Sequence, residues 1–228
     1  MSQDPDAAPI NPLPAAVVIL ALPIVLMEFA FIAGAEGFLG GPEAVGWRLS
    51  ALKSYGFIPA VFDAASQTGR WSLAVVLPLL SYSFIHLSFM HMVMVLVFLL
   101  ALGKLVGEVM GSRAVFAIFF GSAIAGGLAL ALLTDSAYPL AGGYPAVYGL
   151  IGGYTFILRA RLIADGSPGR QAFTLIGVLL FIQLVFGLLF GSGPDWIAEI
   201  AGFGAGFAVS PLLLPGGFSR ILARLRSR

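Results

Sequence analysis

Residues 141–153 read AGGYPAVYGLIGG, a glycine-rich turn that opens a helix of apolar residues. Glycine lets the backbone turn tightly and approach its neighbours closely, so a turn of this kind can hold a functional side chain at the start of a buried helix. In this chain the position in question is Tyr144, and Pro145 follows it. The stretch predicts a helix that begins near residue 144, with a candidate site at its start.

The composition places that helix in a membrane. The chain has 228 residues, of which 59% are hydrophobic and 10% charged, and its mean hydropathy is +1.00. Ordinary soluble domains do not reach such values. A span needs about 20 apolar helical residues. We therefore predict an all-α membrane protein, a six-transmembrane-helix bundle with spans near 14–35, 82–103, 114–133, 144–163, 171–191 and 196–214.

One membrane domain is expected, at 14–214, between a cytoplasmic N-terminal segment at 1–13 and a basic cytoplasmic tail at 215–228. The segment before the first span has no lysine or arginine, so we interpret this span as retained and not as a signal peptide. The long loop at about 36–81 contains WRLSALKSYGF and PAVFDAASQTG, which are typical of short amphipathic pieces in the membrane interface. The tail is either an amphipathic surface helix or a solvated segment.

Lysine and arginine are distributed unevenly between the two sides of such a bundle. Six spans put both termini on one side, which would carry nine of these residues against three on the other. Basic residues gather on the cytoplasmic side of membrane proteins. We therefore expect a multi-pass protein with both termini cytoplasmic, in the inner membrane if the source is bacterial.

No cofactor is expected from the residue types present. The chain has no cysteine, which excludes disulfides and thiolate metal sites. His86 and His91, if both lie on one helix, point about 140° apart and cannot chelate a metal together. A net charge of +1 gives no reason to expect a nucleic-acid partner. The number of subunits is left open.

Small residues recur at helical spacing in the fourth and sixth predicted spans. Such spacing lets helix backbones approach closely inside a membrane, where the hydrophobic effect does not drive association. We therefore expect these two spans to cross tightly, through Gly149, Gly152, Gly153, Gly202 and Gly206.

Few ionisable groups lie at membrane depth, and each needs a reason because burying a charge there costs roughly 2.5 to 3.5 kcal/mol on insertion scales. They are Glu28, His86, His91 and Glu199, with Tyr144 as a polar aromatic. The last four fall within about two turns of the outer ends of their predicted helices. Tyr144 and Glu199 also share the faces of the glycines, which predicts that the two side chains meet or nearly meet. We interpret them as a hydrogen-bonded pair that satisfies both groups inside the bundle.

Three blocks of sequence resemble the rhomboid intramembrane serine proteases. They are SFIHLSFMHMVMVLVFLLALG at 83–103, GGYPAVYGLIGG at 142–153 and EIAGFGAG at 199–206, and the resemblance covers about residues 75–210. It implies a six-helix rhomboid-like bundle with a membrane cleft at the starts of the second, fourth and sixth helices.

The resemblance also implies a site whose catalytic residues are replaced. His86 and His91 match the family's two histidines, whereas Val95 falls at its oxyanion-assisting asparagine. Gly142 and Gly143 precede Tyr144, which falls at the nucleophilic serine, and Pro145 falls at the glycine after it. Glu199 falls at the catalytic histidine. The family's Trp-Arg pair would fall at Leu77 and Pro78, and Trp47 with Arg48 lies too far upstream to be the same feature.

Three functions remain open at this point. The first is a rhomboid-like pseudoprotease that binds transmembrane protein clients or partner proteins in the bilayer without cutting them. The second is the family's activity, an intramembrane serine-type endopeptidase. The third is transport or a proton relay through Glu28, Glu199 and the histidines. Proline has no backbone N–H to stabilise an oxyanion, and the loss of serine and histidine together favours the first.

Overall fold

The computed structural model describes residues 12–191 and 193–217. Within those ranges six helices are long and apolar enough to cross a membrane, and the predicted all-α fold with six spans is confirmed. They are α1 (Ala15–Ala35), α6 (Phe89–Met110), α7 (Ser112–Leu133), α8 (Tyr144–Ala164), α9 (Thr174–Phe190) and α10 (Asp195–Leu213), with η3 (Gly169–Phe173) leading into α9.

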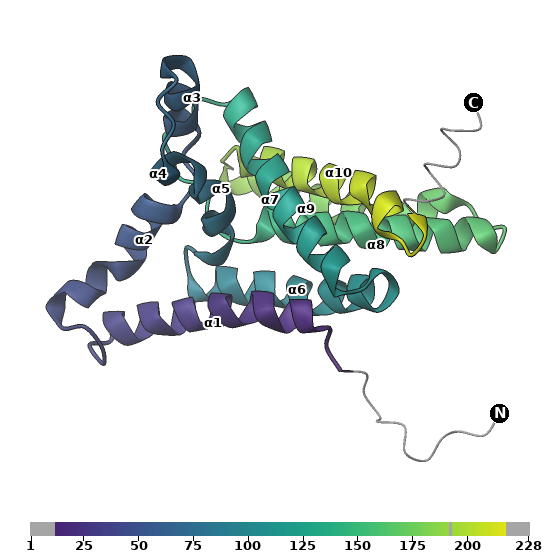
Figure 1. The fold of residues 1–228 in the computed structure, drawn as a ribbon, viewed down its shortest axis with the longest axis horizontal. Coiled ribbons are helices and arrows are strands. Elements are labelled where there is room, and N and C mark those ends of the chain that lie inside the picture. Colours follow the sequence, from purple (N-terminus) through teal and green to yellow (C-terminus); the bar gives the residue numbers. More distant parts are fainter. Residues whose placement is uncertain (1–11, 192, 218–228) are drawn as a thin grey trace, which may run out of the picture.

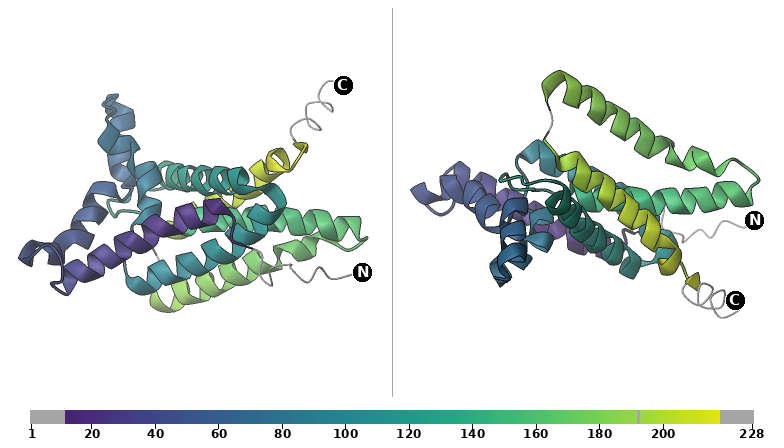
Figure 2. Two further views of the ribbon diagram at one scale, coloured as in Figure 1. Left: turned by 60° about the horizontal axis from the view of Figure 1, so that its bottom comes forward. Right: turned by 90° about the horizontal axis from the view of Figure 1, so that it is seen from above.

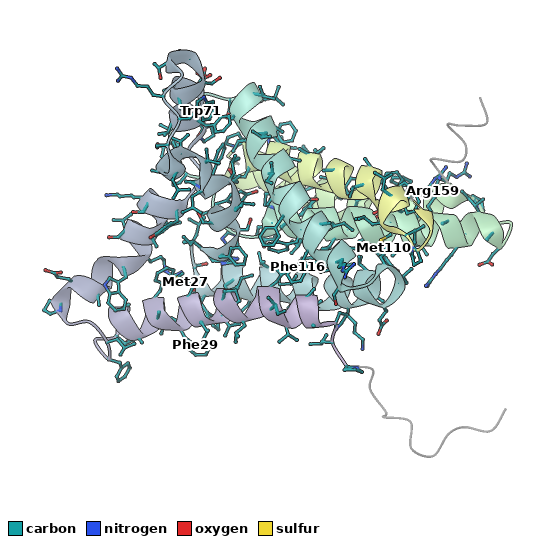
Figure 3. The ribbon with its side chains drawn as sticks, viewed as in Figure 1. Met27, Phe29, Trp71, Met110, Phe116 and Arg159 are labelled. Carbon is teal, nitrogen blue, oxygen red and sulfur yellow. The ribbon has the colours of Figure 1, made fainter. Side chains whose placement is uncertain are left out.

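The loop between the first two spans folds into short helices that stand at one end of the long ones (Figure 1). They are η1 (Pro42–Gly46), α2 (Trp47–Tyr55), α3 (Pro59–Thr68), α4 (Leu73–Val76), α5 (Pro78–Ser81) and η2 (Tyr82–Phe84). Helices α2 and α3 occupy the two segments expected to be amphipathic. Trp71 lies with this group, whereas Met110 and Arg159 lie toward the opposite end of the bundle (Figure 3).

The second span begins later than the sequence predicts, at Phe89 instead of residue 82. The chain before it makes the 3-10 turn η2 and is then extended at Ile85. Ser88 caps the helix, because its hydroxyl accepts a hydrogen bond from the backbone N–H of His91 at 3.2 Å. His86 consequently lies in a loop and not on the helix, and the 140° separation of the two histidines is wrong.

Helices α8 and α10 cross at close range, with glycines at the contact. A Cβ atom on Gly202 would overlap the carbonyl oxygen of Pro145, and one on Gly206 would overlap that of Gly149. A Cβ on Gly152 would overlap the carbonyl oxygen of Phe203. This crossing fixes the start of α8 beside the first turns of α10.

Helix α9 packs least against the rest of the bundle. Only 11% of its most apolar 18-residue window is buried, against 56% for α8. Seen from above, it runs apart from α8 and α10 (Figure 2). Large side chains such as Leu184, Phe186 and Leu188 are exposed along it.

Most of the two terminal segments lies outside the described residues. These are residues 1–11 of the N-terminal segment and 218–228 of the basic tail. The expected amphipathic or solvated state of the tail therefore stays a prediction.

Candidate functional site

A cavity of about 400 Å³ lies at the end of the bundle where α6, α8 and α10 begin. Four helices each contribute a polar side chain to it: His91 from α6, Tyr144 from α8, Gln183 from α9 and Glu199 from α10. We call this cavity the cleft. The other described residues of its wall are Leu87, Ser88, Met90, Met94, Leu140, Ala141, Pro145, Gly193, Asp195 and Trp196.

The glycine-rich turn is held in place by backbone hydrogen bonds. Phe57 and Leu140 exchange a pair, at 3.0 and 2.7 Å between nitrogen and oxygen. Two residues later, the N–H of Gly142 donates to the carbonyl oxygen of Tyr82 at 2.8 Å. Gly142 has a φ of +92°, and a Cβ there would lie 2.5 Å from the ring of His91. Glycine is therefore required by backbone conformation and by space.

His86 is hydrogen-bonded to the backbone of this turn. Its Nε2 accepts a hydrogen bond from the N–H of Gly143 at 3.3 Å, and its ring meets that of His91 edge-on with centroids 5.2 Å apart. The side chain is buried, and burial, reinforced by the neighbouring His91, lowers the pKa of His86 to about 3. It is therefore neutral at physiological pH and acts as an acceptor.

An ion pair between α1 and α2 holds the loop of His86. Arg48 donates to both carboxylate oxygens of Glu28, at 2.7 and 2.8 Å, and to the backbone carbonyl of His86 at 2.7 Å. Its guanidinium also lies 5.0 Å from the ring centroid of Phe31. Sequence reasoning missed this role, because it judged Arg48 only by its distance from Leu77. A buried carboxylate on the first span, near the first arginine after it, was the available signal.

Tyr144 and Glu199 both line the cleft but have different partners. The ring of Tyr144 stacks on that of His91, with centroids 4.9 Å apart and 17° between the planes. The Oε2 atom of Glu199 accepts a hydrogen bond from Nε2 of Gln183 on α9. Over the described residues, no hydrogen bond joins the phenol to the carboxyl group, so that prediction does not hold. Neither stacking on His91 nor the role of Gln183 was foreseen.

The cleft is poor in the groups that acyl transfer needs. Ser88 is the one serine among the described residues that line it, and its hydroxyl serves as the cap of α6. Val95 is buried where the resemblance implies an asparagine, and its Cγ1 would lie 2.8 Å from a Cβ on Gly143. Nε2 of His91 is buried without a hydrogen-bond partner among the described residues. A nucleophile must lie within hydrogen-bond reach of a base, and among the described residues of the cleft no hydrogen bond joins a side-chain hydroxyl to a histidine or carboxylate side chain.

The residues described do not gather into a metal site. No group of three or more histidine, aspartate or glutamate side chains among them could hold a metal ion.

The family described as Rhomboid domain matches residues 73–216, which is more than half of the chain and includes every described residue that lines the cleft. The supporting residues on α1 and α2 lie outside the matched range. No curated protein sequence matches the chain.

Proposed function

The chain belongs to the rhomboid family and is a multi-pass integral membrane protein, and from this premise we propose that it binds transmembrane segments in the cleft without cutting them. The observation that carries the proposal is how the two key positions are occupied: Tyr144 is stacked on His91, and Glu199 is hydrogen-bonded to Gln183.

The geometry of the cleft supports a protein that does not cut. Proteolysis by a hydroxyl requires a base within about 2.6–3.2 Å of it and donors for the oxyanion. The Tyr144 hydroxyl has no hydrogen bond to Glu199 in the described structure, and Pro145 offers no N–H. Ser88, the one serine among the described residues of the cleft, serves as a helix cap.

Binding is supported by the shape of the bundle around α9. A second cavity of about 360 Å³ lies between α9 and α10, lined by Leu180, Leu184, Leu188, Trp196 and Ile200 among others. It is apolar, and it adjoins the cleft. An apolar helix that entered beside α9 could gain packing with these side chains, which is what stabilises helix association inside a membrane.

The rival functions have less support. The family resemblance implies serine-type endopeptidase activity, and the described residues of the cleft include no hydroxyl hydrogen-bonded to a side-chain base in support of it. A proton relay through Glu28 and Glu199 would need both carboxyl groups to lie along one continuous proton pathway. Glu28 is instead paired with Arg48, outside the cleft.

The proposal is tested with the purified full chain in lipid nanodiscs. A photo-crosslinking amino acid at Met94, which lines the cleft, should capture single-span peptides, whereas one at the exposed Leu132 of α7 should not exceed background. No peptide fragments and no labelling by a fluorophosphonate probe are expected. Cleavage of a peptide or labelling of a serine would overturn the proposal that the protein does not cut. Equal capture at Met94 and Leu132 would overturn the proposal that the cleft binds transmembrane segments.

A further inference from the structure

The two buried glutamates in the membrane spans have different kinds of hydrogen-bond partner. Glu28 on α1 is matched by Arg48, which donates to both of its carboxylate oxygens. Glu199 on α10 has an amide, Gln183, as its hydrogen-bond partner, and only at Oε2. Among the described residues, the chain therefore supplies a cation for Glu28 and none for Glu199.

A second carboxylate adds to the same wall. Asp195 lies one turn before Glu199 on α10, also lines the cleft, and forms no hydrogen bond or salt bridge with another described residue. No lysine or arginine is among the described residues that line this cavity. Asp195 is exposed at the start of α10, whereas Glu199 is buried. A carboxylate buried at membrane depth is expensive and is almost always paired. The counter-charge that Glu199 lacks among the described residues points to something that enters the cleft from outside.

The cavities next to Glu199 and Asp195 limit which kind of molecule can bring a positive charge to them. Gln183 and Trp196 line both the cleft and the apolar cavity between α9 and α10, so the two spaces share a boundary. From the carboxylates, an apolar groove runs along α9 past Leu184 to Leu180. An occupant that fits both parts is apolar over about two helical turns and cationic at one end.

We propose that the partner recognised by this cleft is a transmembrane helix with a lysine or arginine near one end. This inference rests on the proposed binding function and specifies its occupant. The apolar body lies against Leu184 and Trp196, and the aliphatic stem of the basic side chain carries its charge to Glu199 and Asp195. Long basic side chains bury their stems and place their charged ends in this way.

The test uses four single-span peptides with one leucine-rich sequence. They carry lysine, arginine, glutamine or glutamate at one position near the end, and each is titrated against the full chain with the crosslinker at Met94. We expect the lysine and arginine peptides to be captured about tenfold better than the glutamine peptide, and the glutamate peptide least. The preference should fall to about onefold in Glu199→Gln combined with Asp195→Asn.

The control variant is Glu108→Gln, at the other end of α6, where the carboxylate pairs weakly with Lys104 at 3.9 Å. It should keep the full preference. If the double variant does not fold, Asp195→Asn alone and the peptide series still decide the question, because the peptides alter no residue of the protein. Equal capture of all four peptides would overturn this inference and leave the binding function standing. Capture of none would overturn both.

Discussion

The ring of Tyr144 lies on the ring of His91, 4.9 Å away between centroids, at the position where the family resemblance implies a serine. The stack covers one face of the histidine, and the buried Nε2 atom of that histidine has no partner among the described residues. The tyrosine ring therefore packs against His91.

Replacing this ring should loosen the cleft without unfolding the protein. Tyr144→Ala removes an aromatic pair worth about 0.5–1.5 kcal/mol beyond the buried area, so a modest fall in the thermal midpoint is expected. The control is Tyr138→Ala, at a residue that is 84% exposed, which should leave the midpoint unchanged. Equal effects of the two substitutions would contradict the role given to the stack.

The crossing of α8 and α10 predicts a sharp difference between two glycines of one helix. Gly206→Ala would place a methyl group on the carbonyl of Gly149 and should cost about 1–3 kcal/mol or more through overpacking. Gly204→Ala meets no atom within 4 Å and should be neutral or stabilising by up to about 1 kcal/mol. Thermal unfolding in detergent measures both. A tolerated Gly206→Ala would mean that the helices are further apart than described.

The Arg48–Glu28 pair should matter more than its distance from the cleft suggests. Arg48→Ala leaves Glu28 buried without its cation, which typically costs about 3–5 kcal/mol. The matched control is Lys104→Ala, which breaks a partly exposed pair worth about 0–1 kcal/mol. Because Arg48 also holds the carbonyl of His86, the variant should reduce crosslinking at Met94 as well. Unaltered stability and crosslinking would refute this role.

The buried His86 predicts a loss of stability in acid. Its pKa is lowered from 6.5 to about 3. Between about pH 3 and pH 6.5, His86 is therefore protonated in the unfolded chain and neutral in the folded chain. The free energy of unfolding should therefore fall as pH drops below about 6.5, by up to about 1.4 kcal/mol per pH unit from this group. His86→Gln keeps an acceptor for Gly143 and should flatten that part of the profile. Identical profiles for both proteins would argue against a neutral His86.

The sequence predicted the architecture well and the partners in the cleft poorly. Six spans follow from runs of apolar residues, and the turn before α8 from its glycines. The start of α6 was misplaced because Phe84, Ile85 and Leu87 continue the run of apolar residues before it, and Ser88, as a cap, marks the true beginning. Hydropathy alone does not distinguish the apolar residues of the preceding loop from those of the helix.

The pairing of Glu199 with Gln183 could not be read from spacing. It depends on where α9 lies relative to α10, and no periodicity within either helix fixes that. The role of Arg48 was hidden for a similar reason, because the loop from α1 folds back so that a residue 38 positions before His86 reaches its carbonyl. Contacts between distant segments depend on the packing of the whole bundle.

The most direct test of the central claim is cleavage of single-span substrates by the full chain in proteoliposomes, followed by mass spectrometry. The account predicts intact substrates with the wild-type protein, and cleavage only after Tyr144→Ser, Pro145→Gly, Glu199→His and Val95→Asn are combined. Cleavage by the wild-type protein that Glu199→Gln abolishes would contradict it.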